Sequence, residues 1–159
     1  MTCEVSIALI GLGVMGFKLL ETFNEICKIT CVVIRDNPKS PDKTTKIRKL
    51  QREYPHIRIV CDFKDLLRDD SIEAVVVATP IDSHYKLCKD FLLSGKHVFL
   101  EKPISKNLAE CIELKDIALR NQLTLHIGYK YIYDLGFQEL CKRIEREKIR
   151  WLNLSWFKW

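Results

Sequence analysis

Residues 5–16 read Val-Ser-Ile-Ala-Leu-Ile-Gly-Leu-Gly-Val-Met-Gly, an apolar run that passes directly into three spaced glycines. The spacing is G-x-G-x-x-G between a predicted strand and a predicted helix, the context in which this motif indicates dinucleotide binding. We expect Gly11 to form the tight turn, Gly13 to leave room for a pyrophosphate, and Gly16 to let the helix pack closely on the strand. A glycine-rich turn without a ligand is the alternative that the motif alone leaves open.

Short apolar runs alternate with longer amphipathic runs along the rest of the chain. The clearest is Ala-Val-Val-Val-Ala at 74–78, which is typical of a strand buried on both faces. This alternation predicts an α/β fold with a doubly wound parallel sheet of the Rossmann type, whose ligands bind beyond the carboxyl ends of the strands. The predicted strands are 4–10, 29–34, 57–60, 73–78, 97–100 and 123–127, and the predicted helices are 14–26, 42–53, 62–68, 82–94, 105–121 and 133–148.

Composition excludes several other classes of protein. The 159 residues are 47% hydrophobic, enough for one sizeable core, and the net charge of +5 comes without the basic stripe and interleaved aromatics of a nucleic-acid surface. No apolar run approaches the roughly 20 residues of a membrane span. The seven cysteines include no C-x-x-C pair and no ligand spacing with histidine, so we expect no metal site. We interpret them as reduced, core-filling thiols of a cytoplasmic protein.

The C-terminal segment differs from the rest. A charged helix is predicted at 133–148, and all three tryptophans fall within 151–159, which is typical of a strand. Either this strand pairs within the domain or across a dimer, or it begins a second, α+β domain that lies outside this sequence. We favour the second interpretation and divide the chain into a dinucleotide-binding domain at 1–128 and the start of a substrate or oligomerisation domain at 129–159. An exposed edge strand predicts a homo-oligomer or a partner bound through 151–159.

The end of the second predicted strand bears on the choice of cofactor. Asp36 has the spacing of the acidic residue that binds the adenosine ribose and favours NAD, while Arg35 beside it suits a 2′-phosphate. NAD and NADP therefore both remain open, with a lean toward NADP. Basic residues follow, which we interpret first as a solvated helix face: Lys39, Lys43, Lys46, Arg48 and Lys49.

Two further polar turns follow buried strands, at the edge where a ligand would bind. After the fourth strand, Thr79 offers a hydroxyl, Pro80 fixes the turn, and Asp82 or Ser83 caps the next helix. His84 falls in the first turn of that helix, where packing or capping is a plainer role than catalysis.

The fifth strand ends in Glu101-Lys102-Pro103. An ammonium at Lys102 would lie near the nicotinamide end of a cofactor and could hydrogen-bond a substrate oxygen. Pro103 stiffens the loop, and a cis bond is one way to do so. A surface Glu-Lys pair is the alternative, and the better one for this tripeptide taken alone.

These blocks together resemble a known family. Residues 76–85, residues 95–103 and the leading glycine motif occur in the order and spacing of the nucleotide-binding half of the glucose–fructose oxidoreductase / inositol dehydrogenase (Gfo/Idh/MocA) family. The resemblance extends from residue 4 to about 159. It implies that Lys102 contacts nicotinamide and substrate and is the catalytic candidate here. The candidate cofactor-binding residues are Gly11, Gly13, Val14, Met15, Gly16, Arg35, Asp36, Thr79, Pro80, His84, Glu101 and Lys102.

Two departures from the family pattern stand out. Ile132 occupies the position of an arginine that often follows the sixth strand, and Glu-Lys-Ile-Arg at 147–150 replaces a usual glycine pair. The resemblance also implies a second domain that supplies most substrate contacts, usually a catalytic histidine, and the oligomer interface. A complete dehydrogenase site is therefore not expected within these residues.

The resulting prediction is an NAD(P)-dependent oxidoreductase acting on a sugar, cyclitol or related CH–OH or C=O substrate, represented by its nucleotide-binding domain. The substrate would bind only if the second half is supplied. The alternative is a non-enzymatic or degenerate dinucleotide-binding module that acts through a partner. A ligand-sensing regulatory Rossmann domain ranks last, because it has no reason to carry Glu101-Lys102-Pro103.

Overall fold

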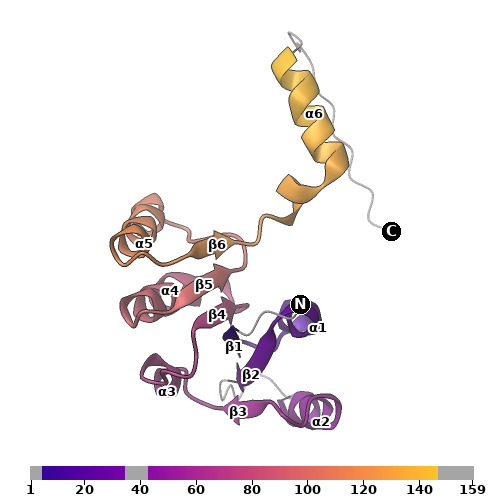
Figure 1. Ribbon diagram of the computed structural model, residues 1–159, viewed down its shortest axis with the longest axis vertical. Coiled ribbons are helices and arrows are strands. Elements are labelled where there is room, and N and C mark those ends of the chain that lie inside the picture. The colour runs from indigo at the N-terminus through magenta and orange to yellow at the C-terminus, as the bar shows by residue number, and fades with distance from the viewer. Residues whose placement is uncertain (1–4, 35–42, 147–159) are drawn as a thin grey trace. The chain divides into compact units, whose positions relative to one another are not determined.

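A computed structural model describes residues 5–34 and 43–146. Within them, six parallel strands form one sheet in the order β3-β2-β1-β4-β5-β6 (Figure 1). The doubly wound α/β prediction is therefore confirmed. The strands are β1 Ser6–Ile10, β2 Lys28–Val33, β3 Arg58–Val60, β4 Ala74–Val77, β5 His97–Leu100 and β6 Leu125–Ile127. The helices are α1 Val14–Ile26, α2 Lys43–Glu53, α3 Lys64–Leu67, α4 His84–Leu93, α5 Leu108–Arg120 and α6 Leu135–Arg146, with short 3-10 turns η1 Ile81–Ser83 and η2 Lys130–Tyr133.

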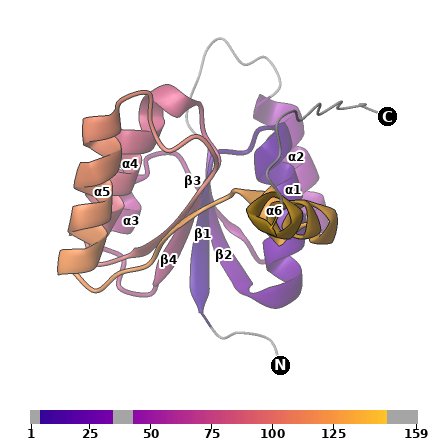
Figure 2. The same cartoon turned by 90° about the horizontal axis from the view of Figure 1, so that it is seen from above.

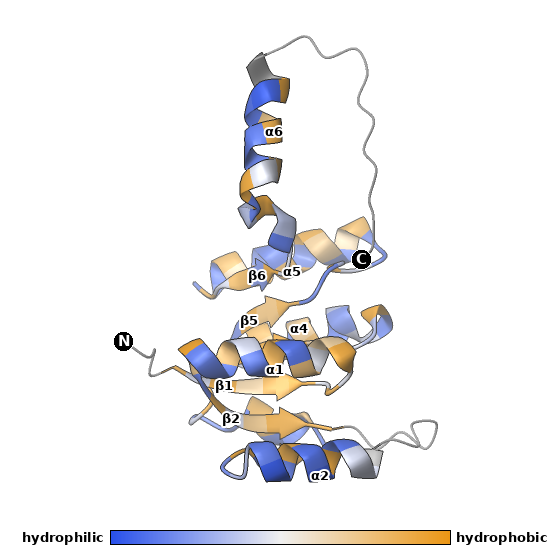
Figure 3. Cartoon of the chain, turned by 90° about the vertical axis from the view of Figure 1, so that its right-hand side faces the viewer, coloured by the Kyte–Doolittle hydropathy of each residue, from blue (hydrophilic) through white to orange (hydrophobic). Residues whose placement is uncertain are grey.

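The strands are apolar because both faces of the sheet are covered. Alternate residues of β1 enter two separate cores: Ala8 and Ile10 pack with α3, α4 and α5, whereas Ile7 and Leu9 pack with α1 and α2. Figure 2 shows α1 and α2 on one side of the sheet and α3, α4 and α5 on the other. In Figure 3 the strands β1, β2 and β5 are apolar, while α2 is a largely hydrophilic helix.

The buried cysteines fill these cores. Cys31 and Cys88 are fully buried, and burial raises the pKa of the Cys88 thiol to about 12, so this thiol stays protonated at neutral pH. Cys111 is half-buried, and the six described cysteines are all free thiols.

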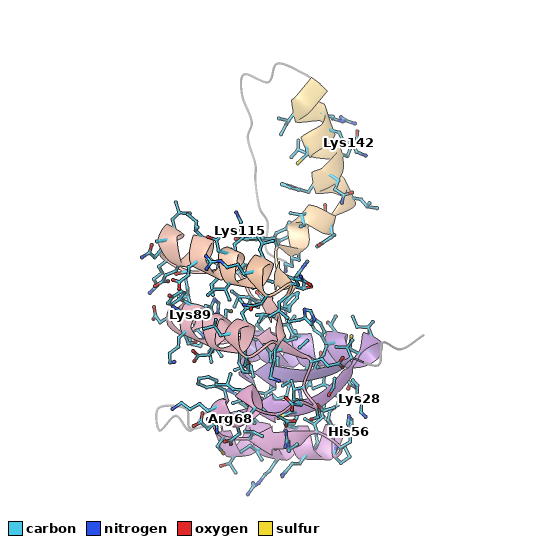
Figure 4. All side chains as sticks on the ribbon, turned by 60° about the vertical axis from the view of Figure 1, so that its left-hand side comes forward. Lys28, His56, Arg68, Lys89, Lys115 and Lys142 are labelled. Atoms are coloured by element: carbon cyan, nitrogen blue, oxygen red, sulfur yellow. The ribbon has the colours of Figure 1, made fainter. Side chains whose placement is uncertain are left out.

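Polar side chains join two of the helices, α4 and α5, that cover one face of the sheet. Lys89 lies on α4 (Figure 4). It donates to Glu113 of α5 at 2.6 Å and to the Tyr85 hydroxyl at 3.0 Å, and that hydroxyl donates to the same carboxylate at 2.6 Å. The hydrogen bond from Lys89 is the main reason why the pKa of Glu113 lies below its ordinary value. This network fixes α4 against α5.

The contacts divide the chain into two units, Met1–Gly128 and Tyr129–Trp159. In the second unit the N–H of Phe137 donates to the Asp134 carboxylate at 2.9 Å, which satisfies one of the free donors at the start of α6. The helix predicted at 133–148 thus begins at Leu135. The tryptophan segment at 151–159 lies outside the described residues, so its strand stays a prediction. No described helix has both the length and the apolarity to cross a membrane.

Candidate cofactor site at the carboxyl edge of the sheet

The glycine turn follows β1 with the geometry that its spacing predicts. Gly11 has φ +96°, a conformation that side-chain-bearing residues rarely adopt, and a Cβ there would lie 2.7 Å from the Ala78 carbonyl oxygen. Its N–H donates to the carbonyl of Val33 at 3.1 Å. The turn is therefore pressed between the ends of β2 and β4.

The start of α1 beyond this turn is open. A Cβ on Gly13 would meet nothing within 4 Å, and the exposed fractions of Val14 and Met15 are 82% and 39%. Gly13 is the N-cap and brings no side chain to the first free N–H groups of α1, and the first turn carries no acidic residue. Free N–H groups and the helix dipole favour an anion here. The turn thus fits the pyrophosphate of a dinucleotide.

The turn after β4 is built from its own polar groups. Thr79 is half-buried and Pro80 is exposed. The Ser83 hydroxyl contacts Thr79 Oγ1 and the Pro80 carbonyl oxygen, both at 2.8 Å. Ser83 does occupy the N-cap position of α4, but its side chain does not cap the helix, because its hydroxyl bonds back to the turn. The exposed Asp82 pairs with Lys106 instead.

The loop after β5 presents the predicted charged pair. The N–H of Glu101 donates to the carbonyl of Val77 at 3.0 Å, which continues the β4–β5 ladder past the strand end. Lys102 is exposed and makes no hydrogen bond or ion pair with any described residue. The Lys102–Pro103 bond is cis, as the sequence suggested.

Gly128, which was not among the predicted site residues, lies against this loop. A Cβ on it would stand 3.2 Å from a carboxylate oxygen of Glu101 and 3.3 Å from the Phe99 ring. Any side chain at this position would crowd Glu101. A lone glycine after a short strand carries no signal by which the sequence alone could reveal that contact.

His84 lies beneath both loops. Its side chain is buried, with 2% of the residue exposed. Its Nδ1 is 2.8 Å from the carbonyl oxygen of Pro103, and its Nε2 is 2.8 Å from that of Thr79. The ring thus joins the two loops that follow β4 and β5.

Three of the predicted segments therefore share one edge of the sheet. β1, β4 and β5 are neighbours and parallel, so the glycine turn, the Thr79 turn and the Lys102 loop all leave its carboxyl edge. This edge contains the switch point between β1 and β4, where ligands of such sheets bind. Arg35 and Asp36 lie outside the described residues, and their roles stay predictions.

The described part of the chain offers no metal site, and a hollow in its surface lies apart from these loops. It holds no group of three or more His, Cys, Asp or Glu residues placed to bind a metal ion. A hollow of about 600 Å³ involves none of the loops above; it is lined by Lys64, Asp65, Leu67, Arg68 and Asp90.

Comparison with known proteins gives a consistent result. Residues 5–129 match the model of the GFO_IDH_MocA oxidoreductase family, NAD-binding Rossmann fold. The chain is 28% identical over 149 residues to the uncharacterized oxidoreductase YrbE of Bacillus subtilis, and 31% identical over 122 residues to an alpha-N-acetylgalactosaminidase of Shewanella oneidensis. The structure of apo scyllo-inositol dehydrogenase from Lactobacillus casei superposes with a TM-score of 0.75 at 21% identity.

These alignments cover most of this chain but less than half of each similar protein. The match to YrbE covers 94% of this chain and 42% of YrbE, and the match to the galactosaminidase covers 74% and 27%. The inositol dehydrogenase alignment covers 94% of this chain and 44% of that structure. The chain thus spans less than half the length of these relatives, and the shared part includes the NAD-binding Rossmann fold at residues 5–129.

Proposed function

The chain belongs to the Gfo/Idh/MocA oxidoreductase family, and from that membership we propose that it serves an NAD(P)-dependent oxidoreductase acting on a sugar, cyclitol or related CH–OH or C=O substrate. The family model describes an NAD-binding Rossmann domain, so a nicotinamide dinucleotide is the cofactor class. The substrate class rests on the resemblance and on sugar-acting relatives such as the galactosaminidase.

One observation carries the proposal. An open helix start after the glycine turn and a lysine after β5 that has no partner among the described residues lie at the same edge of the sheet. Gly11, Gly13, Val14, Met15 and Gly16 would hold the pyrophosphate. Thr79, Pro80 and Glu101 would line the remainder of the site, with Lys102 at the nicotinamide end.

A bound nicotinamide supplies the hydride-accepting or hydride-donating carbon of such a reaction. The role that we assign to Lys102 is to donate a hydrogen bond from its ammonium to the substrate oxygen. That bond favours the developing negative charge on the oxygen when a carbonyl is reduced, and holds the hydroxyl when an alcohol is oxidised. The second half of the longer relatives is the proposed source of the base and the substrate contacts.

NADP is the proposed preference, because Arg35 is suited to pair with a 2′-phosphate. Asp36 beside it opposes that phosphate and favours the ribose hydroxyls of NAD. The balance between these two side chains sets the preference in this proposal.

The proposal is tested by titrating the 159-residue chain with NADH and NADPH in separate calorimetric experiments. We expect saturable binding of at least one of them. Lys102→Met should weaken that binding several-fold, because an ammonium near the nicotinamide carboxamide is lost. Lys106→Met is the matched control, since Lys106 is an exposed lysine of the same loop that pairs with Asp82. Absence of binding by the unmodified chain would refute the proposal.

A second candidate is a dinucleotide-binding module that performs no reaction. It is favoured by Ile132, which is 49% exposed at the position where the resemblance places an arginine. The discriminating measurement is the absorbance of reduced nicotinamide when the chain, joined to the second half of a longer relative such as YrbE, is mixed with oxidised cofactor and a panel of sugars and cyclitols. Binding without reduction of the cofactor by any of these substrates favours the module, and reduction favours the enzyme.

We also propose a location and an assembly for the protein. A cytoplasmic location is supported by the free thiols of the described cysteines. A homo-oligomer or partner contact through 151–159 is supported by the three tryptophans there. Deleting these nine residues should lower the mass measured by light scattering, and an unchanged mass at equal concentration would exclude that contact.

A further inference from the structure

His84 is a buried polar group that the proposed reaction does not use. Both ring nitrogens face backbone carbonyl oxygens at 2.8 Å, one from Thr79 and one from Pro103. A carbonyl oxygen only accepts, so each nitrogen bonds its carbonyl when it carries a proton; a neutral ring donates to one and a protonated ring to both. With its nitrogens directed at the protein in this way, His84 is placed to connect loops rather than to bind a ligand.

The two carbonyls belong to the loops that follow β4 and β5, which form part of the proposed cofactor site. Pro103 directly follows Lys102, so fixing its carbonyl also fixes the backbone that carries the proposed reacting ammonium. Thr79 sits on the other side against the glycine turn, where its Cγ2 would be 2.9 Å from a Cβ on Gly11. A continuous path of contacts therefore leads from Gly11 through Thr79 and His84 to the Lys102 loop.

A second connection between the same loops is far more exposed. Lys106 pairs with Asp82 at 2.5 Å, but their side chains are 66% and 77% exposed. Exposed pairs of this kind contribute little, because water screens them and both side chains must be held in place. Buried hydrogen bonds to backbone carbonyls hold a loop more firmly. The His84 ring is thus the stronger of the two connections.

We propose that His84 is a positioning residue that holds Lys102 at its place relative to the glycine turn, through Thr79 and Pro103. This inference rests on the proposed function of the carboxyl edge as a dinucleotide site. It assigns His84 an effect on the nicotinamide end of the cofactor and none on the adenosine end, because the loop it fixes carries only the nicotinamide-end group. A ring that merely filled space in the core would affect both ends equally.

The test compares two ligands on the full 159-residue chain. One is the preferred reduced dinucleotide, and the other is its counterpart without nicotinamide, ADP-ribose or 2′-phospho-ADP-ribose. Calorimetry measures both affinities, and the affinity for the dinucleotide is divided by the affinity for its counterpart. His84→Phe keeps an aromatic ring but removes both nitrogens, and we expect it to lower the ratio of dinucleotide affinity to counterpart affinity several-fold, and by no more than Lys102→Met lowers it, because the effect acts only through Lys102. His84→Gln keeps an amide donor, so its affinity ratio should lie between that of the unmodified chain and that of His84→Phe.

Lys96→Met is the matched control. Lys96 is also buried, with 4% of the residue exposed, and its ammonium also donates to two backbone carbonyls, those of Asp69 and Ile72, both at 2.9 Å. These groups precede β4 and β5 and so lie at the opposite, amino edge of the sheet. The control should lose stability yet keep the affinity ratio.

The outcomes separate the two proposals. If the unmodified chain binds no dinucleotide, the proposed function fails, and this inference fails with it. If the chain binds but His84→Phe keeps its affinity ratio, only the positioning role is refuted. An affinity ratio that is as low for His84→Gln as for His84→Phe would also refute it, because the donor would then not matter. Should His84→Phe not fold, the ratio for His84→Gln alone decides, with a normal ratio overturning the role.

Discussion

The carbonyl oxygen of Gly11 stands 2.2 Å from the position that a Cβ atom on Gly16 would take. Real atoms do not approach this closely; the Gly11 oxygen belongs to the backbone and the backbone fixes the position of a Cβ, so no side-chain rotation relieves the clash. We expect Gly16→Ala to displace the turn and to lower the free energy of unfolding by about 3 kcal/mol. Denaturant unfolding measures this loss, with Gly13→Ala as control because a Cβ at Gly13 meets nothing. Equal stability of both variants would contradict the contact.

Gly13 should show the opposite behaviour. Because the space around it is open, Gly13→Val should alter the free energy of unfolding by no more than about 1 kcal/mol. The same side chain would occupy the approach of a pyrophosphate to the start of α1, so we expect dinucleotide affinity to fall at least about tenfold. Calorimetric titration checks this, and an unchanged affinity would mean that the pyrophosphate binds elsewhere.

Lys96 should be important for stability. Replacing it by Met removes the donor from the carbonyls of Asp69 and Ile72 and should lower the free energy of unfolding by about 2 kcal/mol. Lys115→Met is the comparison, because Lys115 is exposed on α5 (Figure 4) and its replacement should stay within about 0.5 kcal/mol. Thermal or denaturant unfolding of the two variants distinguishes these outcomes.

Asp69 gives the protein a specific acid sensitivity. Hydrogen bonds from Ser71 and from Arg58 lower the pKa of its carboxyl from 3.8 to about 2. Because the folded pKa lies below the unfolded one, the stabilisation is complete above pH 4 and is lost as the pH falls toward 2. Asp69→Asn should reduce stability at pH 6 by about 1 kcal/mol and flatten its decline between pH 4 and pH 2.

Unfolding curves at several pH values test this prediction. Asp70→Asn serves as the control, because Asp70 is the exposed neighbour of Asp69. Parallel stability profiles for Asp69→Asn and the unmodified chain would show that these hydrogen bonds are not formed in solution.

Cofactor preference should respond to Arg35 and Asp36 in opposite directions. Arg35→Ala removes the proposed partner of a 2′-phosphate, so NADPH affinity should fall about tenfold while NADH affinity changes little. Asp36→Ala should weaken NADH more than NADPH, because the acceptor for the ribose hydroxyls is lost. Titrations of both variants with both cofactors measure these changes. An equal loss of affinity for both cofactors would contradict the proposal that these residues contact the adenosine end.

The sequence was sufficient to predict the layers of the fold. Runs such as 74–78 are apolar throughout because both sheet faces are covered, and glycine spacing at 11–16 reflects contacts only a residue without Cβ allows. Element bounds agree to within a few residues. Helix ends were less certain, since local polar groups decide them: the Ser83 hydroxyl bonds back to Thr79 rather than capping α4.

The candidate site was predictable where side chains carry the signal and not where backbone groups do. Lys102 and the glycines are visible in the motifs. The role of His84 depends on the backbone carbonyl oxygens of Thr79 and Pro103. Every residue has such an oxygen, so the amino-acid sequence does not indicate which of them His84 contacts. Lys96 was hidden for the same reason: a lysine after a glycine suggests a solvent-exposed turn, yet carbonyl acceptors bury it.

Because β1 pairs with β4, the glycine turn can take its final shape only after β4 has been synthesised. Ile10 lies beside Val77, and the Ala78 and Thr79 atoms that confine the glycine turn come with β4. A nascent chain that has emerged only as far as β3 therefore carries the whole glycine motif without the walls that shape it. Pairing over such a sequence distance is slow, because a long loop must close first. Competence to hold a dinucleotide therefore waits for β4, and until β4 pairs with β1 the apolar strands stay exposed to aggregation.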